Sequence, residues 1–461
     1  MLGLISSTDL ESRYSERAIR QIFWKYPQGK AILSYLLSLM DKEETDKPKF
    51  SWFEQAHKHQ ESTTATSGSL GGGGAGPFVN SANTASQAAA GFAWTSGTTY
   101  GIYVADASKF LVDDCVWLKR VPHSTTANTY LDLNGIVTAI DTALNYILVV
   151  STATVADVSN DTDANSIAVM NVGKSAAEGD RSREGRVEFP IEPENYTQIF
   201  RQAVGPFPST ALKAGLRFDK TGIYASAVKQ ASLDITESIE MSAFFGERGV
   251  QTVTNQGGKS VPRRQTGGVR WFLKQYELAD GGSFGYRTGG SAITSSAWQT
   301  EEAKRVIQVN GNVTCAQLEG LLRRAFENTA DGSFEKLLVC GSTLYDVFQK
   351  YFALKSIKTT TLKTKEESYG MTINMWESPW GTLYLKSHPL FQRTALRTTG
   401  FVLDVGCLSW MDMNDREITL LKNRQNNDED GRKDEFLGEG GMVVKAPENH
   451  LYLEGITGLT V

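Results

Sequence analysis

Residues 219–248 read "DKTGIYASAVKQASLDITESIEMSAFFGER", a stretch of about thirty residues that contains no proline. Steps of three and four residues separate its apolar positions, Tyr224, Val228, Ala231, Ile235 and Ile239. This spacing predicts one helix with a continuous apolar side. At 1.5 Å per residue the helix is roughly 45 Å long, whereas the average globular helix has only about 11–12 residues. The reason for a helix of this length has to come from the remaining sequence.

The opposite side of this predicted helix is polar. It carries Lys229, Gln230, Thr236, Glu237 and Glu240. Leu233 and Phe244 interrupt that polar side, so we expect a second surface of the helix to contact another element. Taken alone, the pattern also suits a long helix that crosses the sheet of an ordinary enzyme.

Composition places the chain among globular proteins of two or three domains. It has 461 residues, 40% of them hydrophobic, and a mean hydropathy of −0.29. The apolar run "AILSYLL" at 31–37 is too short to span a bilayer, and the first residues lack the basic and apolar regions of a signal peptide. We therefore expect no membrane contact.

The cysteine spacing indicates the redox compartment, and the net charge bears on whether the chain binds nucleic acid. Four cysteines lie far apart without a CxxC pair, which suits unpaired thiols in a reducing compartment. The net charge of −5 lacks the surplus of Lys and Arg that binds nucleic acid by bulk attraction. If a chain of this charge encloses DNA, it does not bind the DNA by bulk electrostatic attraction.

The first half of the chain changes composition several times. Residues 1–60 resemble amphipathic helices, and residues 61–98, with four glycines at 71–74, predict an extended arm with little core of its own. Period-two patterns over about 99–172 predict a small β-domain. A charged link at 175–186 and an extended arm at 187–218 lead into the long helix.

The second half mixes helices and strands. Thr314 is placed to cap a second amphipathic helix, and "KLLVCGSTLYDVFQKYF" predicts a strand, a glycine turn and a helix. Further strands are expected at 370–422, and two more around a proline turn in the last twenty or so residues. The predicted fold class is α+β.

Three motifs resemble ligand-binding sites, but each lacks a residue that such a site requires. Gly258-Lys259-Ser260 ends like a phosphate loop, but Val253 stands where that loop needs glycine. "NNDEDGRKDEFL" at 426–437 imitates a calcium loop, yet Leu437 replaces its bidentate carboxylate. His57 and His59 have no third ligand nearby. We expect no cofactor and no metal.

One enzyme hypothesis remains as the alternative function. Ser342 follows a predicted strand and opens a helix, as the nucleophile of a hydrolase does, but a threonine replaces the glycine after it. In this alternative a soluble hydrolase with a β-rich accessory domain uses Ser342 with His388 or His450. A structural role before proline is the simpler interpretation of His388.

Several segments, in order, resemble the major capsid (major head) proteins of tailed phages (Caudoviricetes). The resemblance is carried by "YGMTINMWESPWGTLYLKSHPLF", "FVLDVGCLSW" and the closing "PENH…EGI", together with "FRQAVGPFPST" and the entry "KYPQGKAILSYLLSLMDKEETDKPKFSWFEQ". It covers nearly the whole chain and is loosest in the β-domain. After "CLSW" this chain has "MDMNDREITLL", where the family tends to have a basic, proline-containing segment.

The resemblance implies the Hong Kong 97-type fold, in which the helix at 219–248 is the spine of a flat subunit. It implies an N-terminal arm at 1–50, an extended loop at 51–212 carrying the β-domain at about 99–172, and a peripheral domain at 213–309. An axial domain at 310–410 and a C-terminal return to the peripheral domain at 411–461 complete the expected order.

The implied function is structural and not enzymatic. Hexamers and pentamers would form an icosahedral head around double-stranded DNA, assembled in the host cytoplasm as part of the virion. A scaffolding protein, a portal and decoration proteins are implied as partners. A decoration or tail-tube subunit is a third hypothesis, but it lacks the spine helix. We predict inter-subunit contacts from the arm, at Trp52, Phe53, Tyr196, Phe200 and Arg201, because an extended arm has no core to bury them.

Overall fold

The chain divides into two compact units. Residues Met1–Gln55 and Pro190–Val461 form the main unit, and Ala56–Phe189 form the inserted unit. The computed structural model describes residues 36, 39–55, 60–65, 76–88, 91–161, 164, 167–176, 178–179, 190–213, 223–255, 257–278, 305–327, 334–356, 366–368, 371–378 and 380–460. The observed mixture of helices and sheets is the predicted α+β class.

The long helix is α3, Ile223–Phe245. Its 23 residues make it roughly 35 Å long. The prediction of one long helix is confirmed, but the helix ends at Phe245 and not at Arg248. A Cβ on Gly246 would lie 2.5 Å from the backbone oxygens of Ser242 and Thr266, so the chain turns there through a residue that must be glycine. Residues 219–222 lie outside the described residues.

The two sides of α3 agree with the sequence pattern except at one position. Ala231, Ile235 and Ile239 are buried, as the spacing predicts. Phe244 is also buried, so the apolar side widens toward the C-terminal end. The placement of Glu240 on the polar side was wrong, because its side chain is buried among the residues that this wider side contacts.

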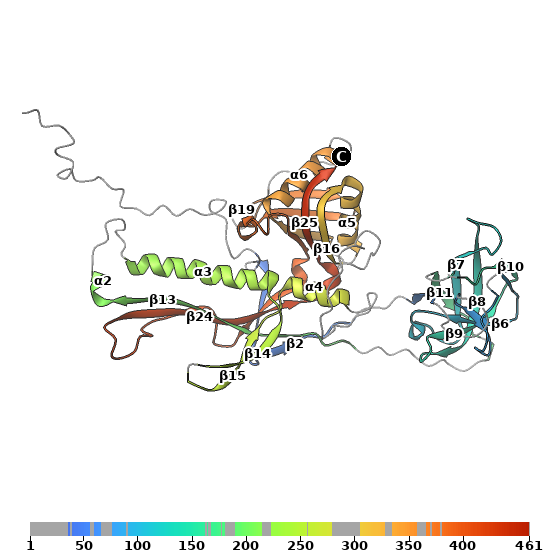
Figure 1. Cartoon of the computed structure of the whole chain (residues 1–461), viewed down its shortest axis with the longest axis horizontal. Helices are drawn as coiled ribbons and strands as arrows, with labels where there is room; N and C mark the ends of the chain where they lie inside the picture. Colours follow the sequence, from blue (N-terminus) through green and yellow to red (C-terminus); the bar gives the residue numbers. More distant parts are fainter. Residues whose placement is uncertain are drawn as a thin grey trace, which may run out of the picture. The chain divides into compact units, whose positions relative to one another are not determined.

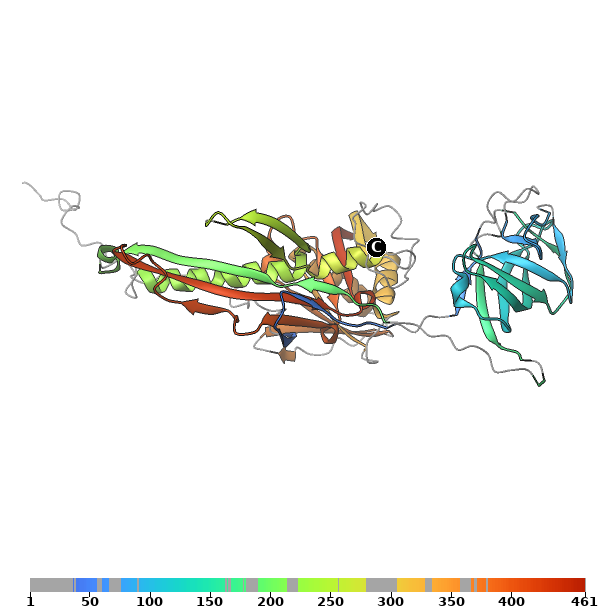
Figure 2. The same cartoon turned by 90° about the horizontal axis from the view of Figure 1, so that it is seen from below.

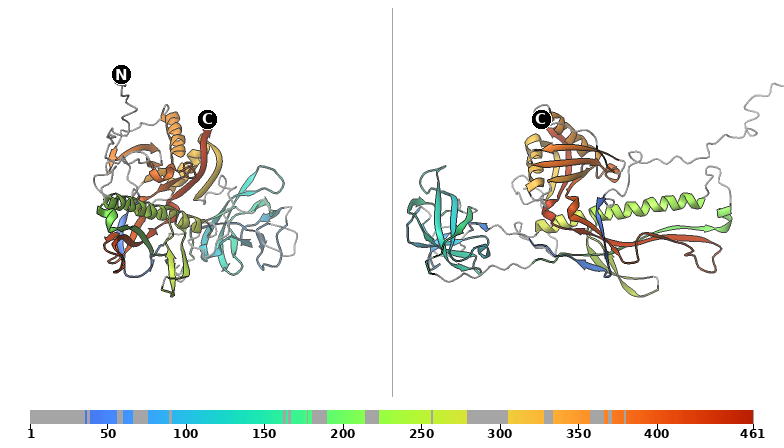
Figure 3. Two further views of the ribbon diagram at one scale, coloured as in Figure 1. Left: turned by 60° about the vertical axis from the view of Figure 1, so that its left-hand side comes forward. Right: turned by 180° about the vertical axis from the view of Figure 1, so that it is seen from behind.

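A five-stranded sheet lies alongside α3. Its order is β1-β22-β24-β13, with β23 also paired to β24. The strands are β1 Asp41–Thr45, β13 Gln198–Pro208, β22 Leu408–Met413, β23 Thr419–Leu421 and β24 Gly431–Val444. In Figure 1 and in the turned views of Figures 2 and 3, α3 runs along the paired β13 and β24. The first core cluster fills the space between them.

A seven-stranded mixed sheet carries the second core cluster. Its order is β16-β25-β21-β17-β20-β19-β18. The strands are β16 Val306–Thr314, β17 Glu335–Cys340, β18 Glu366–Ser368, β19 Met371–Ser378, β20 Gly381–Ser387, β21 Gly400–Leu403 and β25 Leu451–Thr460. Helices α5 (Cys315–Glu327) and α6 (Ser342–Ser356) pack on it.

Local signals in this region predicted the structure well. Thr314 Oγ1 accepts from the Gln317 amide at 3.3 Å, and Gln317 Oε1 accepts from the Thr314 amide at 3.0 Å, so the predicted cap is present. The strand, glycine turn and helix around Gly341 are also confirmed.

The remaining elements of the main unit are short. They are β2 Lys49–Ser51, β12 Glu194–Tyr196, α2 Ser209–Lys213, β14 Gly249–Thr254, β15 Ser260–Gln265, α4 Val269–Leu278 and the 3-10 turns η6 Pro389–Gln392, η7 Val405–Cys407 and η8 Pro447–Asn449. β2 pairs only with β12, and β14 only with β15, within the described residues. α4 contributes Phe272 and Leu273 to the first core cluster.

The inserted unit is a β-structure with its own core. Its sheet has the order β3-β11-β7-β8-β9-β6-β4, and β5 pairs with β10. The strands are β3 Glu61–Thr63, β4 Phe78–Asn80, β5 Phe92–Trp94, β6 Thr99–Tyr103, β7 Asp114–Pro122, β8 Tyr130–Asp141, β9 Tyr146–Ser151, β10 Val155–Val158 and β11 Ala168–Lys174. A bridge between Thr64 and Val104 brings the ends of the sheet together.

Three organisational predictions were wrong. Residues 41–51 form β1 and β2 and not helix, because their backbone pairs with β22 and β12. The supposed arm at 61–98 contributes β3, β4 and β5, and two of its aromatic residues, Phe78 and Trp94, are fully buried. Residues 411–461 do not stay together, since β24 joins the five-stranded sheet whereas β25 pairs with β16 and β21.

Candidate assembly surface

Two of the five predicted contact residues belong to the core of the main unit. Phe200 is only 5% exposed, and its ring lies 6.3 Å from that of Trp410. Trp52 packs 5.6 Å from Phe272 and donates its Nε1 hydrogen to Glu54 at 2.6 Å. The premise that this arm has no core was wrong here, because β13 pairs with β24 along α3.

The other three residues lie nearer the surface. Phe53 is 71% exposed, the most exposed large apolar side chain described. Arg201 is exposed and forms an ion pair with Glu435. Tyr196 is half-buried, with the Arg248 guanidinium 4.9 Å from its ring centre. Of the five predicted contact residues, Phe53 and Arg201 are therefore the two with exposed side chains.

The face of β13 and β24 that points away from α3 carries ion pairs. Arg201 donates to both carboxylate oxygens of Glu435, at 2.7 and 2.9 Å. This hydrogen bond holds the pKa of Glu435 below its usual value. Four residues along β24, the buried Glu439 pairs with Arg416 at 2.6 Å and also accepts a hydrogen bond from Thr197 Oγ1 at 2.8 Å. Because Arg201 is exposed, its pair with Glu435 contributes about 0–1 kcal/mol, and its main role is to set the charge pattern of the face.

A second charged cluster ties β12 to the end of α3. Glu194 accepts hydrogen bonds from Lys49 on β2 and from Arg248. The bond from Lys49 is the largest cause of the lowered pKa of Glu194, and Arg248 adds to it. Arg248 also lies 5.6 Å from the Trp271 ring centre. The backbone that follows α3 is thus held against β12 and α4.

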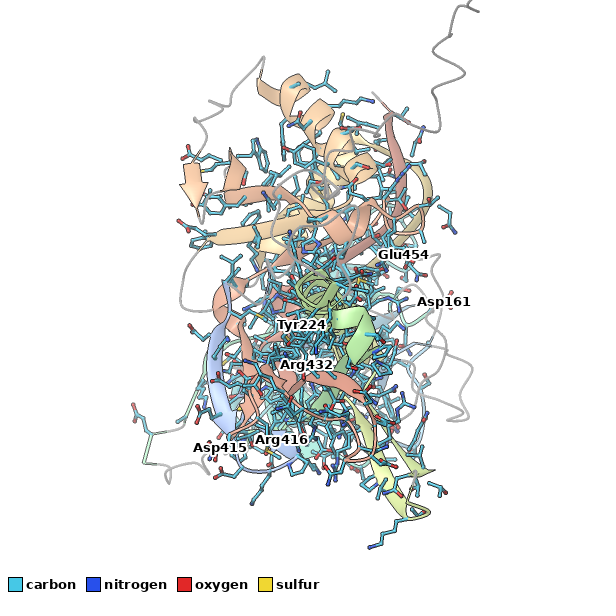
Figure 4. All side chains as sticks on the ribbon, turned by 90° about the vertical axis from the view of Figure 1, so that its left-hand side faces the viewer. Asp161, Tyr224, Asp415, Arg416, Arg432 and Glu454 are labelled. Atoms are coloured by element: carbon cyan, nitrogen blue, oxygen red, sulfur yellow. The ribbon has the colours of Figure 1, made fainter. Side chains whose placement is uncertain are left out.

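The first turn of α3 is clamped to β24. The Tyr224 hydroxyl donates to Asp434, and Arg432 both donates to Asp434 at 3.0 Å and lies over the Tyr224 ring, 4.0 Å from its centre. Figure 4 shows Tyr224 and Arg432 side by side. Burial raises the pKa of Asp434, but the bonds from Tyr224, the Asn423 amide and Arg432 outweigh it and leave that pKa lowered.

Near its other end, α3 carries a buried carboxylate. Glu240 Oε1 lies 3.3 Å from His388 Nε2 and accepts from the Leu36 amide at 2.6 Å. His388 Nδ1 accepts from the Leu390 amide at 3.2 Å, which assigns the ring proton to Nε2 and makes it a donor to Glu240. Glu240 therefore joins the backbone at Leu36 and the turn after β20 to α3.

Asn195 is a buried junction that no pattern in the sequence predicts. Its Nδ2 donates to Thr266 Oγ1 at 3.1 Å, to the Gly267 carbonyl at 3.0 Å and to the Met442 carbonyl at 2.7 Å. Its Oδ1 accepts from the Gly267 amide at 2.9 Å. One side chain thus joins β12, the turn before α4 and β24. An isolated asparagine in a Pro-rich segment carries no signal for such a role.

Lys336 lies in a buried polar cluster beneath η8. It is 1% exposed, and its Nζ donates to the Asn449 carbonyl at 2.6 Å. Burial lowers the pKa of Lys336 to about 8, although Asp404 raises it. Cys407 accepts from Asn449 Nδ2 at 3.5 Å, and burial raises the pKa of its thiol to about 11. This cluster joins β17 to the connection between β24 and β25.

The family of the chain follows from comparison with known sequences. A family model described as "SU10 major capsid protein" matches residues 22–457. The chain belongs to the SU10 major capsid protein family. The prediction of a tailed-phage major capsid protein is confirmed at that level.

Solved structures similar to this capsid protein share little sequence with it. The capsid of a native GTA particle matches with 7% identity and a TM-score of 0.40, over 99% of this chain and 100% of that one. The capsid of Myoviridae phage XM1 matches with 8% identity and a TM-score of 0.40, over the same shares of the two chains. Microbacterium phage Oxtober96 matches with 8% identity and a TM-score of 0.39, over 98% and 99%. A search of curated proteins found no match.

The two histidines that the hydrolase hypothesis paired with Ser342 bond to other groups in this capsid protein. Both ring nitrogens of His388 are engaged, by Glu240 and by the Leu390 amide. His450 Nδ1 accepts from the Asp404 amide at 3.1 Å, and burial lowers the pKa of His450 to about 3. His450 is therefore a packing residue and not a suitable base for serine.

The motifs that imitated ligand sites are ordinary turns in this capsid protein. Gly258 and Lys259 lie in the hairpin turn before β15, and residues 426–430 form the exposed turn before β24. His57 and His59 lie outside the described residues. Among the residues that the structure describes, no group of three His, Cys, Asp or Glu side chains is placed to hold a metal. In the same part of the chain, no helix is long and apolar enough to cross a membrane.

Proposed function

We propose that this chain assembles through hexamers and pentamers into the closed icosahedral head of a tailed phage, around double-stranded DNA. Its membership of the SU10 major capsid protein family over residues 22–457 carries the proposal. Head-to-tail contacts between identical subunits close into rings, and rings of five and six subunits together close a shell.

The parts of the chain are proposed to play the roles of the Hong Kong 97-type plan. Residues 1–50 are the N-terminal arm, 51–212 the extended loop, 213–309 the peripheral domain around α3, and 310–410 the axial domain. The long α3 supports the role of spine, because one helix of 23 residues packs along β13 and β24. By its pairing, β25 belongs with 310–410 and not with the peripheral domain.

Phe53 and Arg201 are the proposed contact residues of this loop. Phe53 follows β2, and a large apolar side chain that is 71% exposed gains stability when a neighbouring subunit covers it. Arg201 is exposed on β13 and pairs with Glu435, and charged side chains of a neighbouring subunit can interact with this ion pair. Trp52, Tyr196 and Phe200 act through the fold of their own subunit.

The proposed partners are further copies of this chain, a scaffolding protein, a portal and decoration proteins, with assembly in the host cytoplasm. The net charge of −5 suits a wall that encloses DNA and does not bind it by bulk attraction. The proposed role is structural and not catalytic, since His388 and His450, the histidines considered as partners of Ser342, bond to other groups.

Sedimentation velocity and negative-stain imaging of the purified protein test this function. The protein is expressed alone and together with the scaffolding protein of its phage. We expect shells, or rings of five or six subunits, in at least one of the two preparations. A subunit that stays monomeric or dimeric in both contradicts the proposal. Phe53→Ser is expected to lower the yield of particles without unfolding the subunit, because Phe53 contributes little to the subunit core.

A further inference from the structure

The hairpin of β14 and β15 has no third strand in the part of the chain that the structure describes. Six residue pairs join its strands, from Gly249 and Gln265 to Thr254 and Ser260. None of its described residues is buried, and Val250 is 47% exposed. Figure 1 shows the hairpin extending away from α3 and the seven-stranded sheet. A two-stranded hairpin is marginal in water by itself, so this one gains stability from a partner.

The base of the hairpin is held rigidly. Thr266 and Gly267, directly after β15, bond to the buried Asn195. Arg248, directly before β14, bonds to Glu194. Both strands therefore leave the main unit from anchored positions, and the hairpin is a preorganised projection whose docking costs little ordering entropy.

The hairpin carries positive charge that its own subunit does not neutralise. No Asp or Glu occurs between Glu247 and Glu277. Lys259 and Arg263 are exposed and Arg264 is half-buried. Within the described residues no ion pair reaches these three side chains, whereas Arg270 and Lys274 beyond the hairpin both pair with Glu247. Three neighbouring cations on an acidic protein favour an acidic partner.

Only one edge of the hairpin is free to accept another strand. The Asn255 amide donates to the Lys259 carbonyl at 2.8 Å, so the backbone groups of every second residue, at 250, 252 and 254, point outward from β14. On β15 the corresponding outward positions are 260, 262 and 264, and Pro262 removes the central donor. The open edge is therefore that of β14.

An acidic edge strand with matching properties lies elsewhere in the main unit. β1 is the outer strand of the five-stranded sheet and pairs only with β22 among the described strands. Its sequence "DKEET" is followed by Asp46, and its first four residues are exposed. Asp415 and Glu417, after the neighbouring β22, are exposed as well. Among the described residues this strand has no second strand on its outer edge and an excess of carboxylates, of which Glu43 pairs with Lys445 of its own subunit at 3.4 Å.

We propose that the β14–β15 hairpin docks on the acidic edge strand β1 of a second copy of this chain. Opposite charges select this pairing among possible edge contacts, and like charges keep two hairpins or two β1 strands apart. A nucleic acid is the weaker partner for the hairpin, because a phosphate backbone uses neither the open β14 edge nor the exposed Val250. The inference rests on the proposed self-assembly.

The test compares charge reversals on the two surfaces during particle assembly. In Arg263→Glu/Arg264→Glu we expect the yield of sedimenting particles to fall about tenfold or more, because like charges then face each other. Combining it with Glu43→Lys/Glu44→Lys restores opposite charges and is expected to return the yield to within about threefold of the wild type. Lys119→Glu/Lys174→Glu, the same change of charge on exposed lysines of the inserted unit, is the matched control.

A second variant tests the edge without changing the charge. Thr252→Pro removes an outward backbone donor from β14 and leaves the hairpin's own hydrogen bonds in place, so we expect a similar loss of particles. The circular dichroism of each unassembled variant has to match that of the wild type. Wild-type yields of Arg263→Glu/Arg264→Glu overturn the inference, and so does failure of the combined variant to recover.

The outcomes also separate this inference from its alternatives. If Arg263→Glu/Arg264→Glu forms normal particles that protect less DNA from nuclease, the hairpin binds nucleic acid and the inference is wrong. If the wild type itself forms no particles, the proposed function fails and takes this inference with it. Normal wild-type assembly with unaffected hairpin variants overturns the inference alone.

Discussion

His388 Nε2 and Glu240 Oε1 lie 3.3 Å apart, and neither side chain has any exposed surface. The imidazole is enclosed by Phe244 and Phe391, whose ring centres lie 5.6 and 5.2 Å from its own. The same carboxylate accepts from the Leu36 amide. The spine helix thus holds the start of the described N-terminal segment through one buried, hydrogen-bonded charge, and such a charge is costly to leave without partners.

Glu240→Ala is expected to destabilise the subunit by about 3 kcal/mol, because it leaves a buried imidazole donor and a buried amide without an acceptor. Amide exchange at Leu36 and at residues 39–45 is expected to accelerate in this variant. The free energy is measured by urea unfolding of the unassembled subunit.

Glu237→Ala is the matched control for that change. Glu237 lies on the same helix but is partly exposed and pairs with the exposed Arg393, so its loss is expected to cost less than about 1 kcal/mol. Equal effects of the two substitutions would mean that the Glu240 contacts contribute nothing specific.

Asn195→Ala tests the junction between β12, the turn before α4 and β24. The change leaves buried carbonyl oxygens of Gly267 and Met442 and a buried Gly267 amide without their partner. We expect a loss of about 2–4 kcal/mol and faster amide exchange in both β14 and β24. Asn414→Ala removes one exposed hydrogen bond, to Asp46, and is expected to change stability by less than about 0.5 kcal/mol.

The sequence predicted the elements of the main unit better than their buried polar contacts. Period and capping residues located α3, α5 and α6, because those signals are local. Glu240 was misplaced, since a charged residue four positions before Phe244 is buried only if a distant segment supplies its partners. His388 lies 148 residues away in the chain, and no local pattern reports such a pairing.

Strand pairing explains the other errors. β1 and β2 have polar, charged sequences without apolar alternation, and they are strands only because β22 and β12 supply hydrogen bonds. The Gly- and Ser-rich segment at 61–98 contributes core residues because Phe78 and Trp94 are enclosed by the other strands of the inserted unit. The prediction of Phe200 as an interface residue assumes that its segment has no core. Phe200 on β13 is in fact buried in the first core cluster.

Tyr224→Phe is expected to make the subunit less stable at pH 7 but not at low pH. The Tyr224 hydroxyl helps to hold the pKa of Asp434 below its usual value, so this contribution is present above the unfolded pKa of about 3.9. It is lost as the pH falls through the lower, folded value. The difference in unfolding free energy between wild type and variant should therefore shrink below about pH 4.

Tyr103→Phe is the control for that pH profile. The Tyr103 hydroxyl donates to the Asn83 amide oxygen at 2.9 Å, a group that does not titrate. Its substitution is expected to shift stability equally at pH 7 and at pH 4. A pH-independent effect of Tyr224→Phe would contradict the role assigned to Asp434.

Lys336→Met tests the buried lysine beneath η8. Because burial lowers the folded pKa of Lys336 to about 8, the unfolded chain binds the proton more strongly between pH 8 and about 10.5. Unfolding free energy should rise across that interval by up to about 3 kcal/mol in the wild type relative to Lys336→Met. Lys47→Met changes an exposed lysine and should leave the profile unaltered. Parallel profiles for wild type and Lys336→Met would show that Lys336 keeps an ordinary pKa.

Removal of residues 56–189 is expected to leave the main unit folded. The two ends of the deletion already lie together, because Glu54 bridges Ile191 and β2 pairs with β12. The first core cluster takes no residue from the inserted unit, which has a core of its own. A short Gly-Ser turn from Gln55 to Pro190 therefore closes a hairpin that exists already, at a small cost in loop entropy.

Hydrogen exchange across α3 measures the outcome of this deletion. Protection at residues 223–245 equal to that of the full chain is the expected result, and loss of it would show that the main unit depends on the insertion. The matched control deletes 60–174 instead, which also removes every strand of the inserted unit, from β3 to β11, but leaves longer ends and keeps Lys49–Glu54 and Ile191–Tyr196 paired. Amide protection of α3 should be the same in both deletion variants, because neither deletion removes a residue that buries the helix.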